Sequence, residues 1–526
     1  MRFFNTAGPI KPELHYCIPP LLRFDLAEVL LLIEQQKYFV LHAPRQVGKT
    51  SFLLALMDYL NQSGQYHALY FNVEVAQTAR EDVARGVRAI LSMLSLMARD
   101  RLHDPAPEEI RQNLLQNLEG DTALLELLSR WAQASAKPLV LLVDEIDALV
   151  GDTLISVLRQ LRAGYANRPA SFPQSIILCG VRDVRDYRIH SSREKTVITG
   201  GSAFNVKARS LRLGDFDRQE MEQLYQQHTA ETGQAFTANA LDLLWELTQG
   251  QPWLVNALGY ELCFEMREGR DRTQPITVEM VAKAKENLIL RRETHLDQLA
   301  DKLKEPRVHR VIAPILAGDL EPEQLPADDV QYVADLGLIT TKGQIRIANK
   351  IYQEVIPREL IYTTQLTITH QPEWYIAGDG SLDMPKLLTA FQQFFREHSA
   401  SWLQQFDYQE AGPQLLLQAF LQRIINGGGQ VTREYGLGRD RTDLLILWPY
   451  GDKQVQRVVI ETKLRRGTVA ATIYKGVEQT WRYMDSSAAM EGHLVLFDRE
   501  KAKSWAEKIF SQQEQYQGRT IQVWGM

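Results

Sequence analysis

The feature that most constrains this chain is a loop containing glycine and lysine between an apolar segment and a helical pattern. Residues 38–42, YFVLH, are typical of a buried strand, and 51–60, SFLLALMDYL, have the apolar spacing of a helix. The loop between them, residues 43–50, reads APRQVGKT. In this setting, backbone N–H groups and the helix N-terminus face an anion. We therefore expect Lys49 to reach the β- and γ-phosphates of a nucleotide and Thr50 to coordinate Mg²⁺.

The first position of the loop differs from the usual pattern, which has glycine where this chain has Ala43. This change requires a less crowded turn, but it leaves the Gly-Lys-Thr core intact. The residues predicted to bind the nucleotide in this loop are Ala43, Pro44, Arg45, Gln46, Val47, Gly48, Lys49, Thr50 and Ser51.

A second motif follows later in the chain, where the apolar run 139–143, LVLLV, ends in Asp144 and Glu145. A fully apolar strand is buried on both faces, so its terminal acids emerge at the carboxyl edge of a parallel sheet, beside the loop. We expect Asp144 to hold Mg²⁺ and Glu145 to polarise water against the γ-phosphate as a catalytic residue. An acidic strand end in an unrelated α/β fold is the alternative, and the presence of both motifs in this order argues against it.

The wider pattern predicts a multidomain α/β protein. Short apolar strands alternate with helical patterns, which indicates a parallel sheet with helices on both faces. The strands are expected at 38–43, 68–73, 139–144 and 175–180.

Four further changes in pattern suggest domain boundaries. A helical stretch is expected to form a lid, helices followed by a small hairpin suggest a winged helix, and a polar, turn-rich stretch suggests a linker. The predicted organisation is a nucleotide-binding core at 1–210, a helical lid at 211–300, a winged helix at 301–362, a linker at 363–384 and a second α/β domain at 385–526.

Composition leaves the choice of partner open. The net charge of the 526 residues is -6, so any binding of nucleic acid requires a local basic surface. The three cysteines lie far apart and suggest buried free thiols, not a zinc site or a disulfide framework. No apolar run approaches the length of a membrane span, and the N-terminus has no signal-peptide pattern, so a cytoplasmic location is expected.

Residues 1–360 resemble AAA-like ATPases of the STAND and origin-recognition type, which share the acidic DEID sequence, the helical lid and the winged helix in this order. The resemblance implies that ATP and Mg²⁺ are the cofactors. It also implies that two features lie near the adenine: the segment that begins at His15, and Arg23. Pro252 of the sequence Gly250-Gln-Pro252 is implied to touch the nucleotide.

The same resemblance suggests a γ-phosphate sensor after the strand at 175–180, with Arg182 as the candidate. An arginine there could recognise phosphate charge through its fork of donors. Alternatively, Arg182, Arg185 and Arg188 could pair with Asp183 and Asp186 on a solvated loop.

In the hairpin of the predicted winged helix, Lys342 and Arg346 are too few to form a convincing phosphate-binding face. This favours a contact between domains or with another protein over sequence-specific DNA recognition.

The C-terminal region carries a second group of acids. In the strand pattern 456–464, Glu461 and Lys463 share one face, while Thr462 points to the other. Asp443 opens the preceding strand, so strand pairing would bring its carboxylate beside Glu461. Two carboxylates and the carbonyl of Thr462 would suit Mg²⁺, and Lys463 could activate water or stabilise charge on phosphorus.

Residues 385–526 resemble the PD-(D/E)XK nuclease superfamily, in the variant found beside bacterial AAA-like ATPases; the implied fold is a restriction-endonuclease-like α/β domain. Thr442 stands where the family has proline, and the acid expected from the first helix is either Glu410 or Glu434. By the resemblance, Gln479 of the following helix assists catalysis; Lys475, Gln479 and Tyr483 share one helix face.

Arginines cluster around these elements and would provide the local basic surface; they are Arg433, Arg439, Arg441, Arg465, Arg466 and Arg482. The alternative is a surface hairpin in which Glu461 and Lys463 only form an ion pair.

The leading hypothesis is a nucleotide-gated nuclease, with ATP at the first site and Mg²⁺-dependent cleavage of nucleic acid at Asp443, Glu461 and Lys463. DNA is favoured over RNA as the substrate, a homo-oligomer is considered, and no membrane partner is expected. A role in defence against phages or mobile elements would rest on family analogy. The alternatives are a signalling or assembly ATPase whose C-terminal domain binds without cutting, and an ATP-driven DNA remodeller.

Overall fold

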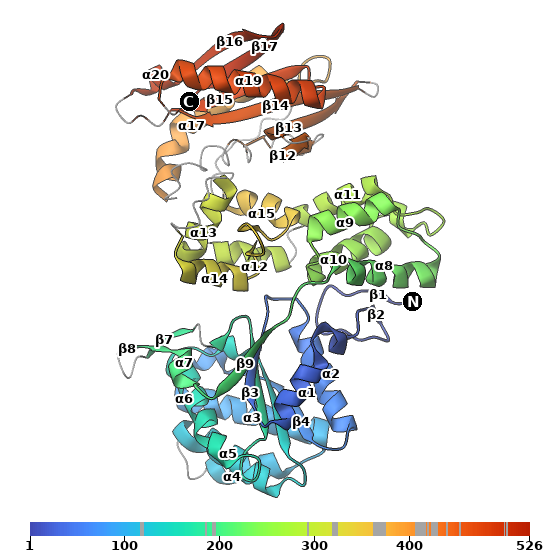
Figure 1. Ribbon diagram of the computed structural model, residues 1–526, viewed down its shortest axis with the longest axis vertical. Helices are drawn as coiled ribbons and strands as arrows, with labels where there is room; N and C mark the ends of the chain where they lie inside the picture. The colour runs from blue at the N-terminus through green and yellow to red at the C-terminus, as the bar shows by residue number, and fades with distance from the viewer. Residues whose placement is uncertain are drawn as a thin grey trace. The chain divides into compact units, whose positions relative to one another are not determined.

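The computed structural model describes most of the chain and divides it into two compact units (Figure 1). Unit 1 comprises Met1–Asp297 with Pro326–Tyr352, and unit 2 comprises Gln298–Leu325 with Gln353–Met526. The described residues are 1–115, 120–184, 187–191, 196–291, 294–303, 305–317, 325–360, 375–405, 417, 420–421, 430–437, 440–451, 454–465, 467–498, 500 and 503–526.

A five-stranded parallel sheet forms the centre of unit 1. Its strands, in spatial order, are β4 (His67–Asn72), β5 (Leu139–Asp144), β6 (Ser175–Gly180), β3 (Tyr38–His42) and β9 (Lys207–Arg212). The parallel sheet is confirmed, and the four expected strands lie within one residue of their predicted bounds. The sequence pattern did not reveal β9, because KARSLR is a largely exposed edge strand without an apolar run.

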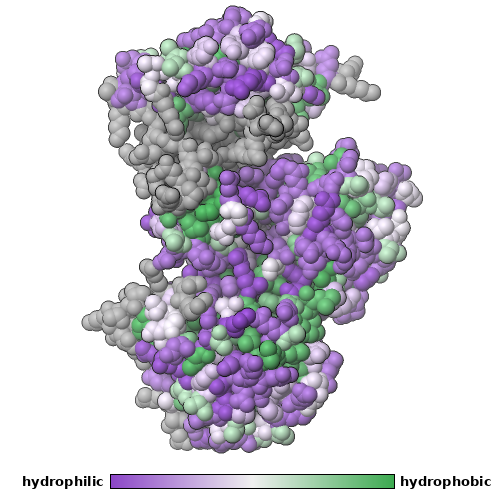
Figure 2. Space-filling view, in the orientation of Figure 1, coloured by the Kyte–Doolittle hydropathy of each residue, from purple (hydrophilic) through white to green (hydrophobic). Residues whose placement is uncertain are grey.

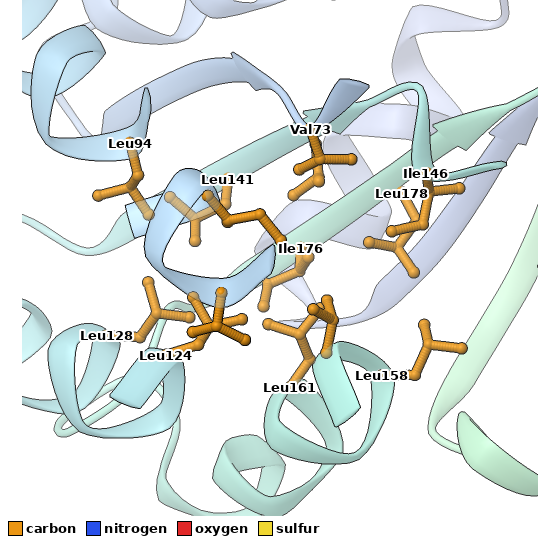
Figure 3. Packing of buried hydrophobic residues seen from close by; sticks show 14 of the residues in the cluster. Val73, Leu94, Leu124, Leu128, Leu141, Ile146, Leu158, Leu161, Ile176 and Leu178 are labelled. Carbon is orange, nitrogen blue, oxygen red and sulfur yellow. The ribbon is translucent and has the colours of Figure 1, made fainter. Parts of the chain in front are cut away.

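Helices cover both faces of this sheet. On one face, α1 (Leu26–Glu34) and α2 (Lys49–Gln62) pack against Val140 and Leu142. On the other, α3 (Val83–Leu102), α5 (Gly120–Ala134) and α6 (Gly151–Ala163) pack against Leu141 and Val143 (Figure 3). Adjacent residues of β5 therefore serve opposite cores, which explains why the strand is apolar throughout.

The remaining elements of unit 1 include a helical group drawn in green in Figure 1. Its helices are α8 (Arg218–Thr232), α9 (Ala238–Thr248), α10 (Pro252–Tyr260) and α11 (Val278–Leu290). Two short N-terminal strands, β1 (Phe3–Phe4) and β2 (His15–Tyr16), pair in parallel. The other short elements are α4 (Ala106–Leu115), β7 (Arg188–Ser191), β8 (Thr196–Thr199) and α7 (Gly200–Ala203).

In the stretch of chain that follows the helical group, helices are succeeded by a hairpin, as the sequence pattern indicated, and then by a last helix. These elements are α12 (Thr294–Leu303), α13 (Pro306–Ala317), α14 (Ala327–Asp335), β10 (Ile339–Thr340), β11 (Arg346–Ile347) and α15 (Lys350–Leu360). The hairpin is antiparallel, with Ile339 opposite Ile347.

The second α/β region lies in unit 2 and has a six-stranded mixed sheet, in the order β12-β13-β14-β15-β17-β16. Its first three strands are antiparallel, whereas β14, β15 and β17 run parallel. In chain order the elements are α17 (Met384–Gln405), β12 (Gln430–Leu437), β13 (Asp440–Tyr450), β14 (Gln454–Leu464), α19 (Val469–Ser487), β15 (Glu491–Phe497), α20 (Trp505–Lys508), β16 (Phe510–Tyr516) and β17 (Arg519–Gly525).

Helix α19 covers one face of this sheet through Ile473 and Val477, which pack with Val459 and Leu494 (Figure 1). The aromatic contact between Phe395 of α17 and Phe497 of β15 lies on the other face. Glu410, one of the two acids considered for the first helix of this domain, lies outside the described residues.

The surface in Figure 2 is mainly hydrophilic, with hydrophobic residues scattered among hydrophilic ones. Within the described part of the chain, no helix combines the length and apolar character that a bilayer crossing requires.

Candidate active sites

The loop after β3 turns sharply into α2 at Gly48, whose φ of +106° is unfavourable for residues with a side chain. Lys49 begins the helix and is only 8% exposed. Its Nζ donates hydrogen bonds of 2.9 Å to the carbonyl oxygens of both Ala43 and Pro44. The lysine thus folds back over its own loop, which holds its charge at the place where phosphate would lie.

The other predicted loop residues fall into two groups. Val47 is buried, whereas Arg45 and Gln46 are exposed at the tip of the loop. Ser51 lies in the first turn of α2, and its Oγ accepts a hydrogen bond of 3.0 Å from the backbone N–H of Ile10. The N-terminal segment is therefore tied to the phosphate-binding helix.

The structure brings Asp144 and Thr50 together. Asp144 ends β5 and is fully buried, and its Oδ2 accepts hydrogen bonds from Thr50 Oγ1 at 2.8 Å and from the Tyr70 hydroxyl at 3.0 Å. Its Oδ1 accepts from the backbone N–H of Glu145 at 3.0 Å. A hydroxyl and a carboxylate in contact beside a phosphate-binding loop form a donor set that fits Mg²⁺.

Glu145 has a left-handed backbone, with φ of +57°. Such a conformation costs free energy in a residue with a side chain, and it turns the chain away from the strand direction directly after Asp144. Burial raises the pKa of the Glu145 carboxyl, and the nearby Asp147 carboxylate raises it further. Asp147 Oδ1 also accepts a hydrogen bond of 3.2 Å from Val181 N, which links the ends of β5 and β6.

Arg182 follows β6 and is mostly buried. Its Nε lies 3.7 Å from Asp335 Oδ2, at the end of α14, and its guanidinium lies 4.7 Å from the ring centroid of Tyr332. Asp183, one of the partners considered for it, forms an ion pair with Lys207. Arg185 and Asp186 lie outside the described residues. A segment far along the chain thus meets the residue expected to sense the γ-phosphate.

The same segment also touches the phosphate loop itself. At Gly337 (φ +77°), an added Cβ would lie 2.8 Å from Pro44 Cγ, so these two residues already pack together without a side chain between them. Nearby, Arg212 donates a hydrogen bond of 2.8 Å to the carbonyl oxygen of Ala334.

A pocket of about 700 Å³, including its open mouth, lies beside the phosphate loop. Arg23, Pro252 and the segment at 16–18 all line it, so the structure brings together residues that the resemblance placed near the adenine and Pro252, which it placed in contact with the nucleotide. Arg23 packs over the ring of Phe216 at 4.4 Å and hydrogen-bonds to the carbonyl oxygen of Val47 at 3.4 Å.

Sequence reasoning missed the N-terminal wall of this pocket. Trp253 Nε1 donates to the carbonyl oxygen of Thr6 at 3.0 Å, and Asn5 N donates to Asn256 Oδ1 at 3.2 Å. The residues missed are Asn5, Thr6, Ala7, Gly8, Ile10, Phe216, Leu224, Trp253 and Asn256. Only the Gly8-Pro9 turn signal could have suggested an ordered loop here.

In the C-terminal sheet, Glu461 and Lys463 lie on the same face of β14. Glu461 is 1% exposed, and its Oε1 lies 2.6 Å from Lys463 Nζ. Val459, two residues earlier, packs beneath α19, so the pair lies at the end of the face that α19 covers. Thr462 is also buried.

The backbone of Asp443 belongs to β13, but its side chain lies outside the described part of the structure. In the antiparallel backbone register, Leu444 pairs with Ile460; Leu444 directly follows Asp443, and Ile460 directly precedes Glu461. Among the side chains that are described, no group of three or more His, Cys, Asp and Glu could hold a metal ion. The predicted Mg²⁺ site at Asp443, Glu461 and Thr462 therefore stays a prediction.

On α19, Gln479 Nε2 donates a hydrogen bond of 2.7 Å to the Tyr483 hydroxyl, which joins two of the three residues expected to share a face of this helix. Two of the clustered arginines lie near acids: Arg465 Nη1 contacts both carboxylate oxygens of Asp498 at 3.0 Å, and Arg482 lies 3.9 Å from Glu478. The local positive charge is correspondingly lower than the arginine count suggested.

Several solved structures show similarity to this chain at low identity. The Walker-type ATPase PABY2304 of Pyrococcus abyssi is 15% identical, with a TM-score of 0.45, and the match covers 67% of this chain and 99% of that one. Cdc6p from Pyrobaculum aerophilum is 13% identical, with a TM-score of 0.36 and coverage of 72% and 93%. The RuvB Holliday junction branch migration motor of Thermotoga maritima is 13% identical, with a TM-score of 0.32 and coverage of 63% and 93%.

A search of curated proteins gave no significant match. The family comparison, by contrast, matches residues 31–356 to the AAA-like domain. This span is more than half of the chain and contains the phosphate loop, Asp144, Arg182 and the helical group. The chain therefore belongs to the AAA-like domain family of P-loop ATPases.

Proposed function

We propose that the chain binds ATP with Mg²⁺ and hydrolyses it at the carboxyl edge of the parallel sheet. The contact of 2.8 Å between Thr50 and Asp144, next to the Lys49 loop, carries this proposal. It joins two residues 94 positions apart in the chain, and both are of the types that a magnesium ion in a phosphate site requires.

The residues fit this assignment. The Lys49 ammonium, held by two loop carbonyls, can exchange these for phosphate oxygens, which are stronger acceptors. Thr50 and Asp144 would hold Mg²⁺, which when bound neutralises phosphate charge. Arg23, Pro252 and the 16–18 segment would surround the base.

Glu145 is the candidate base for the attacking water. Its backbone conformation turns it away from the strand direction, and its raised pKa brings proton affinity closer to that needed at neutral pH. Arg182 is proposed to recognise the terminal phosphate after exchange of its contact with Asp335.

The test is phosphate release from ATP by the purified full chain with Mg²⁺, compared with Glu145→Gln. We expect Glu145→Gln to retain ATP binding and to lose hydrolysis by about 100-fold, the scale of a general base. Glu279→Gln, a change of an exposed acid, should behave as the unaltered chain. Absence of nucleotide binding in the unaltered chain would refute the proposal.

A second candidate function is Mg²⁺-dependent cleavage of nucleic acid by the C-terminal sheet, controlled by the ATPase. Two observations favour it: the order of one helix, three antiparallel strands, a helix and a parallel strand, and the buried Glu461 paired with Lys463. Asp443, Glu461 and the Thr462 carbonyl are the proposed metal ligands, with Lys463 and Gln479 assisting.

The test of this function uses a supercoiled plasmid and single-stranded RNA with Mg²⁺, with and without ATP. Loss of cleavage in Lys463→Ala, with cleavage partly retained in Lys49→Ala, would support it. No cleavage of either substrate under any nucleotide would reject it and favour the alternative, in which this domain binds nucleic acid or a partner without cutting.

A further inference from the structure

One polar contact at the proposed magnesium site comes from outside both nucleotide-binding motifs. Tyr70 lies on β4, where its backbone pairs with Leu142, two residues before Asp144 in the neighbouring strand. Its hydroxyl donates a hydrogen bond of 3.0 Å to Asp144 Oδ2. Because β4 contributes neither the loop nor the acids, this contact is independent of both motifs.

The phenol ring is held in a fixed place. Tyr70 packs against the core formed by α2 and the sheet, which includes Met57 and Leu53. Its backbone N–H also donates to Met57 Sδ at 3.4 Å. A hydroxyl on a packed ring has little freedom to turn away, so it can fix the orientation of the group that accepts its hydrogen bond.

Asp144 needs such a fixed donor. The other side-chain hydroxyl on Oδ2 belongs to Thr50, which is itself a proposed metal ligand in the phosphate-binding helix. When Thr50 adjusts to the metal, its hydrogen bond to Asp144 must adjust with it, whereas Tyr70 lies on β4 and is not a proposed metal ligand. Burial raises the pKa of the Tyr70 hydroxyl, and so does the Asp144 carboxylate; the hydroxyl therefore remains a proton donor at neutral pH.

We propose that Tyr70 is a positioning residue for the metal-binding carboxylate of Asp144, and that its hydroxyl sets the affinity of the nucleotide site for Mg²⁺. The proposal rests on the proposed binding of ATP with Mg²⁺. Loss of a residue that hydrogen-bonds to a metal ligand and orients it typically lowers metal affinity by about 10- to 100-fold. We take the lower end, because Asp144 keeps two other donors without Tyr70.

The competing explanation is that Tyr70 only packs and stabilises the sheet. Tyr38 offers a matched control, because it is also a core tyrosine of the same sheet and its hydroxyl donates to the carbonyl oxygen of Pro173 at 3.1 Å, away from Asp144. Tyr38→Phe and Tyr70→Phe each remove one hydroxyl and keep the ring. Only the second should change the response to magnesium.

The experiment measures binding of a fluorescent ADP analogue to the full chain during a titration with MgCl₂, so that no turnover is involved. In Tyr70→Phe, the Mg²⁺ concentration for half-maximal enhancement should rise about 10-fold. Binding in EDTA should be unchanged, and Tyr38→Phe should follow the unaltered chain. An unchanged magnesium response in Tyr70→Phe, or an equal shift in Tyr38→Phe, would overturn the proposal.

A double-mutant cycle tests whether the effect passes through Asp144. In the background of Asp144→Asn, Tyr70→Phe should cause no further change in the magnesium response, because the carboxylate is already lost. A full additional change of about 10-fold would mean that Tyr70 acts elsewhere. If binding of the ADP analogue to the unaltered chain did not depend on magnesium, the proposed function itself would fail. If the unaltered chain and Tyr70→Phe both showed the same magnesium dependence, only the proposal for Tyr70 would fail.

Discussion

Each of the two candidate sites combines a buried carboxylate with a lysine, and the two lysines are used differently. At the edge of the parallel sheet, Lys49 bonds to carbonyl oxygens of its own loop, while Asp144 accepts neutral hydroxyl and amide donors. In the C-terminal sheet, Lys463 pairs directly with Glu461. The first arrangement leaves a negative charge ready for a cation, whereas in the second a metal must compete with an ammonium group.

This difference has an energetic consequence. Backbone carbonyls hold Lys49 without neutralising it, so its charge is available to a polyphosphate at small cost. The Glu461 carboxylate is 1% exposed and depends on its partner, because a buried carboxylate without compensation is strongly destabilising. Lys49 is thus expected to matter for ligand binding and Lys463 also for folding.

The largest expected effect concerns Lys49. Lys49→Met should lower ATP hydrolysis by at least about 100-fold, because it removes the charge that stabilises the terminal phosphates. Phosphate release by the full chain measures this, and unfolding by urea should show little loss of stability. Lys283→Met, which changes an exposed lysine paired with Glu268, is the control. Hydrolysis at the normal rate in Lys49→Met would contradict the view that the charge of Lys49 is available to the phosphates.

The second prediction concerns folding of the C-terminal sheet. Lys463→Met removes the ammonium group that contacts the buried Glu461, and we expect a loss of about 2 kcal/mol in the free energy of unfolding of this region. This value is below the usual range for buried pairs, because Lys463 is 29% exposed.

Lys386→Met provides the contrast, since Lys386 pairs with Asp383 on the surface of the same unit and is 59% exposed. This change should alter stability by less than about 0.5 kcal/mol. Urea unfolding followed by tryptophan fluorescence would measure both. Equal free energies of unfolding of the two variants would mean that the pair with buried Glu461 stabilises the fold no more than the surface pair does.

A third prediction addresses Arg182, which the structure holds beside Asp335. If Arg182 recognises the terminal phosphate, Arg182→Ala should weaken ATP binding about 10-fold and leave ADP binding nearly unchanged. Competition of each nucleotide against a fluorescent analogue gives both affinities. Arg218→Ala, on the exposed surface of α8, is the control. Equal losses for ATP and ADP would show that Arg182 does not distinguish the γ-phosphate.

The sequence predicted the parallel sheet well because its strands are buried on both faces and therefore apolar throughout. It missed β9, whose exposed edge position permits KARSLR. It nominated Asp144 and Thr50 from local motifs, and the structure brings them into contact.

Contacts between distant segments could not be predicted in the same way. Nothing in the local pattern around Asp335 indicates that it meets Arg182, and the N-terminal wall at Thr6 depends on an indole N–H from the helical group. From the sequence alone, Tyr70 is indicated only as a residue of an apolar strand. Its hydrogen bond to Asp144 could not be predicted, because it depends on the pairing of β4 with β5. These contacts arise from tertiary packing, which a period of two or of about 3.6 residues does not encode.

The smallest expected effect is a shift in pH dependence. Burial raises the pKa of Glu145, and so does the Asp147 carboxylate. A base must be ionised, so hydrolysis should be full above this pKa and fall as pH drops through it. Because the pKa is raised, the fall should occur at higher pH than for an ordinary glutamate. Asp147→Asn removes the like charge while its side-chain oxygen can still accept from Val181 N, so the acidic limb should move to lower pH.

A pH–rate profile of ATP hydrolysis under saturating ATP and Mg²⁺ measures this shift, with Asp58→Asn on the exposed face of α2 as the matched acid-to-amide control. A limb that stays in place in Asp147→Asn would mean that another group, not Glu145, titrates in the catalytic step. A shift of the acidic limb to lower pH in Asp147→Asn would support Glu145 as the titrating base and would further distinguish the two carboxylate sites. In the ATPase domain, the Asp147 carboxylate raises the pKa of Glu145, whereas in the C-terminal sheet a lysine contacts the Glu461 carboxylate.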